Sequence, residues 1–167
     1  NSISKILGIP KEKIKVVLMP NGGGFGGKED ISVQGHAALF SYLLKVPVRV
    51  ALTRPESLCM HPKRHPMNME MSLGCDKKGR LTFVKANIIG DTGAYASVGM
   101  KVLERAAGHA TSVYSIPIVN IKSRAVYTNN VPCGAMRGFG VNQINFAIES
   151  CLDELCVKGG FDRWQIR

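Results

Sequence analysis

Residues 20–30 read PNGGGFGGKED and place five glycines in six consecutive positions. Glycine has no Cβ and accepts positive φ, so such a loop brings backbone N–H groups close to a ligand, although ordering it costs conformational entropy. The preceding residues 14–19 (IKVVLM) have the composition of a strand, and residues 31–44 place apolar side chains at helical spacing. A strand, a glycine loop and a helix in this order predict an anion-binding site, because the N–H groups and dipole of the helix start face the loop.

Two common nucleotide-binding motifs fit this loop only in part. The GxxxxGK spacing of residues 22–28 matches a phosphate loop, but Glu29 stands where a Ser or Thr would hold magnesium. The GxGxxG spacing of residues 22–27 matches a dinucleotide-binding turn, but positions 44–53 carry no acidic residue for the ribose. A nucleotide-binding domain that uses the glycine-rich loop therefore stays an alternative.

Beyond the loop, the apolar periodicity predicts an α+β fold, with a mixed sheet, packed helices and an antiparallel hairpin. One hairpin strand alternates from Met67, and the other covers residues 81–88, with a bulge between Phe83 and Val84. The other predicted elements are helices at 2–7, 31–44, 54–60, 100–110 and 141–157 and strands at 14–19, 48–52 and 118–128. Asp30 is the predicted N-cap of the helix that follows it.

Composition and residue spacing argue against a nucleic-acid site, a disulfide framework, a side-chain metal site and a membrane segment. The 22 Lys and Arg residues against 12 acidic ones give a net charge of +10, but the charges are spread out with few aromatic residues between them, which favours a solvated face over a nucleic-acid site. The five cysteines are irregularly spaced and indicate no disulfide framework. Pro62 interrupts the His61-x3-His65 pair, so no metal site built from side chains is predicted. No long hydrophobic run or leader is visible, so we expect a cytoplasmic protein without membrane contact.

A series of motifs along the chain resembles a known family. The motifs are NGGGFGGKED (21–30), VPVRVALT (46–53), DTGAY (91–95), ERA (104–106), Tyr114-x-Ile116-Pro117 and PCGAMRGFGVNQ (132–143). In this order and spacing the chain resembles the molybdenum-cofactor subunit of the xanthine dehydrogenase and aldehyde oxidase family. Those subunits are several times longer, so the resemblance implies that residues 1–167 are an internal fragment of a molybdopterin-binding domain whose neighbours cover part of its surface. The polar residues 61–66 mark a possible sub-boundary within it.

The resemblance also implies a reaction. It implies a molybdenum–molybdopterin cofactor held partly by this chain, with 2Fe-2S clusters and FAD on partner subunits or domains. The substrate would be a nitrogen heterocycle, either a purine such as xanthine or hypoxanthine or a nicotinate-like ring, hydroxylated at an electron-poor carbon with water as the oxygen source. The general-base glutamate that this reaction needs would lie outside these residues, so the fragment alone is expected to be inactive. The alternative is a non-catalytic scaffold or binding fragment.

The resemblance assigns six cofactor-contacting residues to two loops. We call residues 21–30 the first glycine loop and residues 133–140 the second glycine loop. The six residues are Gly24, Phe25 and Gly26 in the first loop and Ala135, Arg137 and Gly138 in the second. The guanidinium of Arg137 suits an anionic oxygen or the edge of a pterin, and the glycines around it leave room for a close ligand.

Three residues are implied to face the substrate. Glu29 and Arg105 match the catalytic pair of purine-oxidising members, and Phe139 is the ring that would lie against a flat heterocycle. Without the resemblance, Glu29 would be a carboxylate at a helix entry and Arg105 a surface ion-pair partner. Met136 stands where many xanthine dehydrogenases carry Phe, so the outer pocket is expected to have a different shape.

Overall fold

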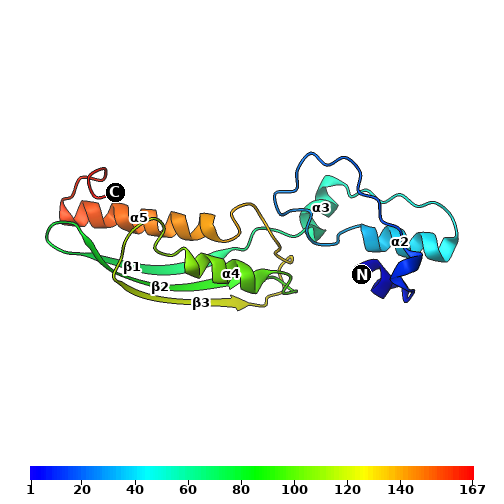
Figure 1. Ribbon diagram of the computed structural model, residues 1–167, viewed down its shortest axis with the longest axis horizontal. Helices are drawn as coiled ribbons and strands as arrows, with labels where there is room; N and C mark the ends of the chain where they lie inside the picture. Colours follow the sequence, from blue (N-terminus) through cyan, green and yellow to red (C-terminus); the bar gives the residue numbers. More distant parts are fainter.

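The computed structural model describes all of residues 1–167, and Figure 1 shows two regions of the chain lying end to end along its longest axis. The N-terminal region (residues 1–60) contains α1 (Ser2–Leu7), a 3-10 turn at Lys11–Lys13, α2 (Gln34–Leu44) and α3 (Arg54–Met60). The sheet region (residues 67–167) contains β1 (Met67–Cys75), β2 (Leu81–Asp91), α4 (Gly99–Gly108), β3 (Ile118–Val126) and α5 (Val141–Gly159). This is the α+β fold with a mixed sheet that the sequence predicts.

The sheet has the order β1-β2-β3 and mixes both kinds of pairing. β1 and β2 form the predicted antiparallel hairpin, with Met69 opposite Ile88, whereas β3 pairs with β2 in parallel. The ladder is irregular where Gly74 and Cys75 face Phe83 and Leu81, which leaves Thr82 as the extra residue. The predicted bulge between Phe83 and Val84 was therefore placed slightly too far along the strand.

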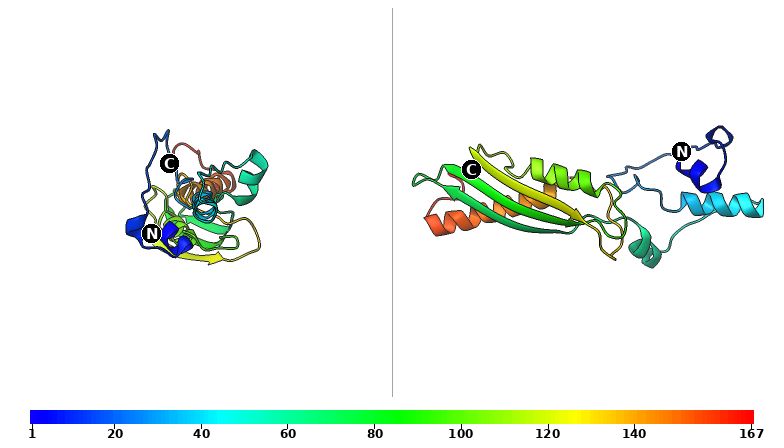
Figure 2. Two further views of the ribbon diagram at one scale, coloured as in Figure 1. Left: turned by 90° about the vertical axis from the view of Figure 1, so that its right-hand side faces the viewer. Right: turned by 90° about the horizontal axis from the view of Figure 1, so that it is seen from below.

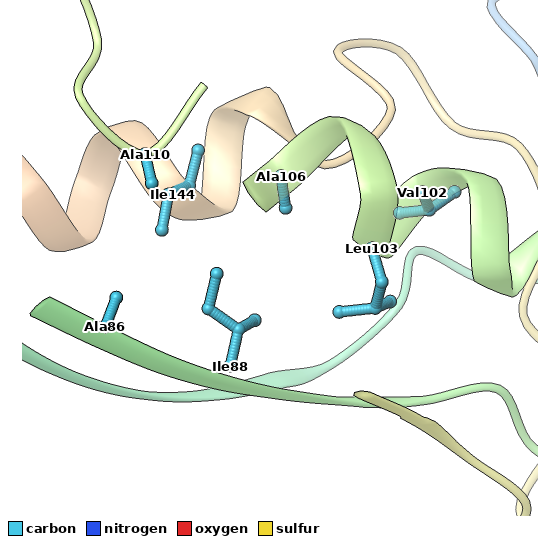
Figure 3. Packing of buried hydrophobic residues seen from close by; sticks show 7 residues of the cluster. All are labelled: Ala86, Ile88, Val102, Leu103, Ala106, Ala110 and Ile144. Carbon is cyan, nitrogen blue, oxygen red and sulfur yellow. The ribbon is translucent and has the colours of Figure 1, made fainter. Parts of the chain in front are cut away.

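One face of the sheet holds the core (Figure 3). The side chains come from β2, from α4 and the turn after it, and from α5: Ala86, Ile88, Val102, Leu103, Ala106, Ala110 and Ile144. Alternate residues of β2 are buried, which is the period of a strand with one covered face. Burying a side chain such as Ile88 stabilises the fold by roughly 1.5–3 kcal/mol. Both helices therefore lie on the same side of the sheet, which Figure 2 shows in two further views.

The N-terminal region has almost no core. Of the 22 buried residues, Gly35 is the only one before residue 61, and it lies under the side chain of Ile6 where α1 packs on α2. Val16 is 79% exposed and Leu18 is 84% exposed. Residues 14–19 and 48–52 form no strand, so both of those predictions were wrong. Their apolar composition is typical of strands, but neither segment has a neighbouring strand to pair with in this chain.

The start of α3 agrees with the prediction, whereas the start of α2 does not. α3 begins with a capping box: the Thr53 side chain accepts a hydrogen bond from the Glu56 N–H, and the Thr53 N–H donates to the Glu56 carboxylate at 2.7 Å. The helix after the first glycine loop begins at Gln34 with Val33 as its N-cap, so the prediction of Asp30 as N-cap was wrong. None of the helices combines the length and the apolar character that crossing a bilayer demands.

Candidate cofactor site

The two glycine loops meet where the N-terminal region adjoins the sheet region. We call this place the joint; it comprises the first glycine loop (21–30), the second glycine loop (133–140) and the start of α4. Gly26 has φ +87°, and a Cβ on it would come within 2.8 Å of the Ala135 carbonyl carbon and 2.9 Å of the Met136 nitrogen. Only glycine allows this approach, because any side chain would collide with backbone that cannot move aside. Residues 109 positions apart in the sequence are therefore in direct contact at this point (135 minus 26).

Both loops contain a Gly-Phe-Gly turn with consecutive residues at positive φ. Phe25 and Phe139 each have φ 51°, in the left-handed region that few residues other than glycine adopt. The neighbouring Gly26 and Gly138 have φ values of 87° and 91°. Such conformations cost roughly 1–3 kcal/mol for a non-glycine residue and cluster at ligand sites. One such turn in each of two loops that contact each other marks this joint as a candidate binding site.

Each loop contains a run of consecutive backbone N–H groups that form no hydrogen bond within the chain, three in the first loop and four in the second. They belong to Gly24, Phe25 and Gly26 in the first loop and to Ala135, Met136, Arg137 and Gly138 in the second. Ala135 is 4% exposed, and buried N–H groups in proteins almost always have an acceptor. Successive free N–H groups in a glycine-rich turn form a concave donor surface for anions. The loops thus fit the anionic, oxygen-rich cofactor that the family resemblance implies.

Two arginines lie over the two phenylalanine rings. The Arg137 Cζ is 5.6 Å from the centre of the Phe25 ring, and the Arg105 Cζ is 6.0 Å from the centre of the Phe139 ring. These contacts join the first loop to the second and the second loop to α4. Neither guanidinium forms an ion pair; on α4 the pair is Lys101 with Glu104 at 2.8 Å, so the surface ion-pair interpretation of Arg105 was wrong. Both positive charges stay available to a ligand.

Glu29 lies at the end of the first loop with an exposed side chain. Its backbone N–H donates to the Gly26 carbonyl at 3.3 Å, which closes the turn. Its carboxylate forms no hydrogen bond or ion pair, and α2 begins five residues later, so it is not a helix-entry carboxylate. The structure shows no contact between Glu29 and Arg105. Contacts pair six of the predicted residues: Gly26 with Ala135, Phe25 with Arg137, and Phe139 with Arg105. The side chain of Glu29 contacts none of the other predicted residues, and no contact to the opposite loop is found for Gly24 or Gly138.

The second loop is held by residues that sequence reasoning did not select. Lys63 forms a parallel bridge with Cys133: the Lys63 N–H donates to the Pro132 carbonyl at 3.1 Å, and the Gly134 N–H donates to the Lys63 carbonyl at 3.0 Å. Nothing in the polar composition of residues 61–66 signals this pairing. It anchors the base of the second glycine loop to the segment that joins the two regions.

His65 is the most deeply buried titratable residue near the loops. The residue is 2% exposed, its Nε2 has no hydrogen-bond partner, and Gly99 at the start of α4 lies close to that nitrogen. Burial lowers the pKa of His65, and the nearby carboxylates of Asp91 and Asp30 oppose this only in part. The imidazole therefore favours its neutral form, as expected for a histidine packed between the sheet and the loops.

Asp91, from the DTGAY motif, organises the turns beneath the second loop. Its carboxylate accepts hydrogen bonds from Thr128 Oγ1 at 2.7 Å, Asn130 Nδ2 at 2.6 Å and the Gly93 N–H at 2.7 Å. The side-chain bonds from Thr128 and Asn130 are the main reason that the pKa of Asp91 is lowered. The ionised carboxylate is therefore a structural centre, and its motif could have identified it from the sequence.

The side chains themselves offer no metal site. No group of three or more His, Cys, Asp and Glu residues is arranged to hold a metal ion, and all five cysteines are free. What the joint presents is a set of N–H donors, two guanidinium groups and two aromatic rings. This chemistry suits a large anionic cofactor with a flat substrate beside it.

The sequence of the chain is similar to those of known proteins. A family model described as "Molybdopterin cofactor-binding domain" matches residues 1–167. Over 165 residues the chain is 43% identical to the nicotinate dehydrogenase large molybdopterin subunit of Eubacterium barkeri, covering 99% of this chain and 39% of that protein. It is 42% identical over 165 residues to one subunit of a probable xanthine dehydrogenase of Bacillus subtilis, covering 99% of this chain and 22% of that protein.

A similar fold occurs in a solved enzyme. An aldehyde oxidoreductase from Desulfovibrio gigas matches with a TM-score of 0.92 and 28% identity, covering 98% of this chain and 18% of that one. The chain spans well under half the length of each of these relatives.

Proposed function

The chain belongs to the molybdopterin cofactor-binding domain family, and from that premise we propose that its two glycine loops hold the molybdenum cofactor of a hydroxylase that oxidises a nitrogen heterocycle. The observation that carries this proposal is the meeting of the loops, with Gly26 against Ala135 and Arg137 over Phe25. The first loop belongs to one region and the second to the other, so the cofactor would be held between them.

Within the site, each group has a role that its chemistry allows. The free N–H groups of the two loops would bind anionic oxygens of the cofactor, and Arg137 would add a charged, forked donor. The bound cofactor would supply the redox centre that takes electrons from the substrate carbon. The packed backbone of the loops would fix the cofactor relative to α4, which carries Arg105.

Substrate recognition would rest on Phe139, Arg105 and Glu29. The Phe139 ring offers a flat surface for an aromatic heterocycle, and Arg105 beside it would stabilise negative charge that develops on the ring during oxidation. Glu29, with no partner of its own, would accept a hydrogen bond from a ring N–H. The two relatives, a nicotinate dehydrogenase and a probable xanthine dehydrogenase, favour such a substrate.

The wider assembly is also part of the proposal. Electrons from the cofactor would pass to 2Fe-2S clusters and FAD on partner subunits or other parts of a longer protein, and the general base would come from the remaining part of the molybdenum subunit. A non-catalytic scaffold is the alternative. Because an aldehyde oxidoreductase has a similar fold, an aldehyde is the alternative substrate. A cytoplasmic location stays a prediction.

The test uses the complete protein with its partner subunits. Bound molybdenum and the oxidation of xanthine, hypoxanthine, nicotinate and a simple aldehyde would be measured for the wild type and for Arg137→Ala, Glu29→Ala and Arg105→Ala. We expect Arg137→Ala to lower molybdenum content, because it removes a charged cofactor contact, and the other two to keep the metal and lose at least about tenfold in heterocycle turnover.

Matched controls come from the same elements. Lys101→Ala removes an exposed positive charge from α4, and Arg124→Ala removes one from β3; neither side chain forms an ion pair with a residue of the glycine loops. Both controls should match the wild type. Wild-type metal content in Arg137→Ala would refute the cofactor assignment, and a wild-type protein without molybdenum would favour the scaffold. Preserved heterocycle turnover in both other variants would refute the substrate assignment.

A further inference from the structure

Asp30 lies where the first glycine loop, the second glycine loop and the start of α4 come together. It was expected to cap the helix after the first loop, but that helix begins at Gln34 and leaves the carboxylate free for other contacts. One oxygen, Oδ1, accepts a hydrogen bond at 2.8 Å from Ser97 Oγ, a residue 67 positions away in the sequence. Such a bond links two segments that no backbone hydrogen bond connects directly.

The other carboxylate oxygen packs against the second loop. Oδ2 lies where a Cβ on Gly134 would project, and Pro62 lies on the same side at 2.8 Å from that position. Gly134 is buried and its N–H is bonded to the Lys63 carbonyl at 3.0 Å, so its backbone cannot shift to make room. The absence of a side chain at Gly134 is therefore what allows Asp30 to reach this place. Position 134 directly precedes Ala135, which the first loop contacts.

The Ser97 contact carries the link on to α4. The Ala96 carbonyl accepts a hydrogen bond from the Gly99 N–H at 2.8 Å, so the turn that holds Ser97 leads directly into the helix. Ser97 itself has φ 40°, which fixes the turn in a conformation that few side chains adopt. α4 then carries Arg105 to its contact with Phe139. Asp30 directly follows Glu29, so its side chain links the end of the first loop to the turn before α4, the helix that carries Arg105.

We propose that Asp30 is a positioning residue that fixes the first glycine loop, and with it Glu29, relative to the second loop and to Arg105. This inference rests on the proposed function for its effect on turnover, but its structural part stands without it. The interaction depends on shape and on an acceptor oxygen, because Ser97 is a neutral donor and Gly134 offers only space. Asparagine keeps both properties, whereas alanine keeps neither.

The experiment compares five variants of the complete protein: Asp30→Ala, Asp30→Asn, Ser97→Ala, the double variant Asp30→Ala/Ser97→Ala, and Glu12→Ala. Glu12 is the matched control, because it is an exposed carboxylate of the same region with no hydrogen bond or ion pair. Hydrogen–deuterium exchange of residues 22–30 reports on the link itself. Bound molybdenum and kcat/KM for nicotinate and xanthine are measured on the same samples.

Asp30→Ala is expected to speed exchange in residues 22–30 by about two- to tenfold, the range that follows from losing one hydrogen bond. Asp30→Asn should stay near the wild type, and the double variant should be no worse than Asp30→Ala, because both changes remove the same interaction. Molybdenum should stay within about twofold while kcat/KM for the heterocycle falls, because the loop N–H groups remain in Asp30→Ala.

Two results would overturn the inference. One is exchange in Asp30→Ala equal to that of Glu12→Ala, and the other is an additive effect of the Asp30 and Ser97 changes. Faster exchange in a protein that neither holds molybdenum nor oxidises heterocycles would leave the positioning role in place and refute the proposed function instead. Equal loss in Asp30→Asn and Asp30→Ala would contradict the shape-based account and assign the effect to charge.

Discussion

The sheet region buries its large apolar side chains, whereas the N-terminal region leaves most of its own exposed. In the sheet region, Ile88, Ile144, Ile148 and Leu152 are completely buried between the sheet and its helices. In the N-terminal region, residues 16–19 are 64% to 84% exposed, and Gly35 is the only buried residue. The difference shows that the second glycine loop stands on a region with its own core, whereas the first loop is placed by what it contacts across the joint.

The largest expected effect comes from removing a core side chain in only one of the regions. Ile88→Ala should lower the free energy of unfolding by about 2–5 kcal/mol, because it leaves a cavity between β2 and its covering helices. The same substitution at Ile31, which is 44% exposed in the N-terminal region, should cost less than about 1 kcal/mol. Urea unfolding followed by circular dichroism measures both. Equal losses of unfolding free energy in the two variants would show that Ile31 is packed as tightly as Ile88.

The next effect concerns the joint between the regions. Gly26→Ala introduces a Cβ at φ +87° against the Ala135 backbone, so we expect roughly 1–3 kcal/mol of strain and a loss of bound molybdenum in the complete protein. Gly22→Ala in the same loop is the control, since no atom lies within 4 Å of its Cβ position and its φ is not positive. Unchanged molybdenum in Gly26→Ala would mean that the loops need not touch for the cofactor to bind.

A smaller effect should arise inside the N-terminal region. Thr53→Ala removes one half of the capping box of α3 and should cost about 1 kcal/mol of stability. Ser57→Ala, on the same helix, removes a hydroxyl that forms no hydrogen bond and should have little effect. Hydrogen exchange of residues 54–60 measures the change locally. Similar exchange in both variants would argue that packing, and not the cap, holds this helix.

The smallest expected effect is the response of the sheet region to acid. The pKa of Asp91 is lowered in the folded protein, so its stabilising contribution is present above the unfolded pKa of about 3.9 and is lost as the pH falls through the folded value. Asp91→Asn should therefore flatten the decline in the urea midpoint below about pH 4. Asp76, whose pKa is lowered by the turn N–H groups of Arg80 and Lys78, provides the comparison at the far end of the hairpin. If the urea midpoint of Asp91→Asn fell with pH as it does in the wild type, the ionised Asp91 carboxylate would not stabilise the fold.

Sequence reasoning succeeded where structure is determined locally. The alternation along β1 and β2 and the long apolar spacing of α5 predicted the hairpin and the helix, because each pattern reports a covered face within one element. The helix predicted at 54–60 also forms, and its start is a local capping box of Thr53 and Glu56. The family motifs also selected residues of both glycine loops, and the structure brings Gly26 and Ala135 together.

It failed where a residue depends on distant parts of the chain. Residues 14–19 look like a strand, but pairing needs a neighbour that only the complete fold provides. Asp30 has the side chain of an N-cap, yet it bonds to Ser97, and no local pattern encodes that choice. His65 lies in a polar stretch and is nevertheless buried, with Gly99 from the start of α4 close to its Nε2. The missing information in each case is a contact between residues far apart in sequence.

The links at the joint also have a consequence for folding order. The Lys63–Cys133 bridge and the Asp30–Ser97 bond each close a long stretch of chain, whereas the hairpin of β1 and β2 closes only a short turn. Long closures lose more entropy before any contact compensates, so they form late. The joint should therefore be the last part of the chain to assemble, and a newly made polypeptide would pass through a stage with a formed sheet and parted loops, open enough for a bulky prosthetic group to enter.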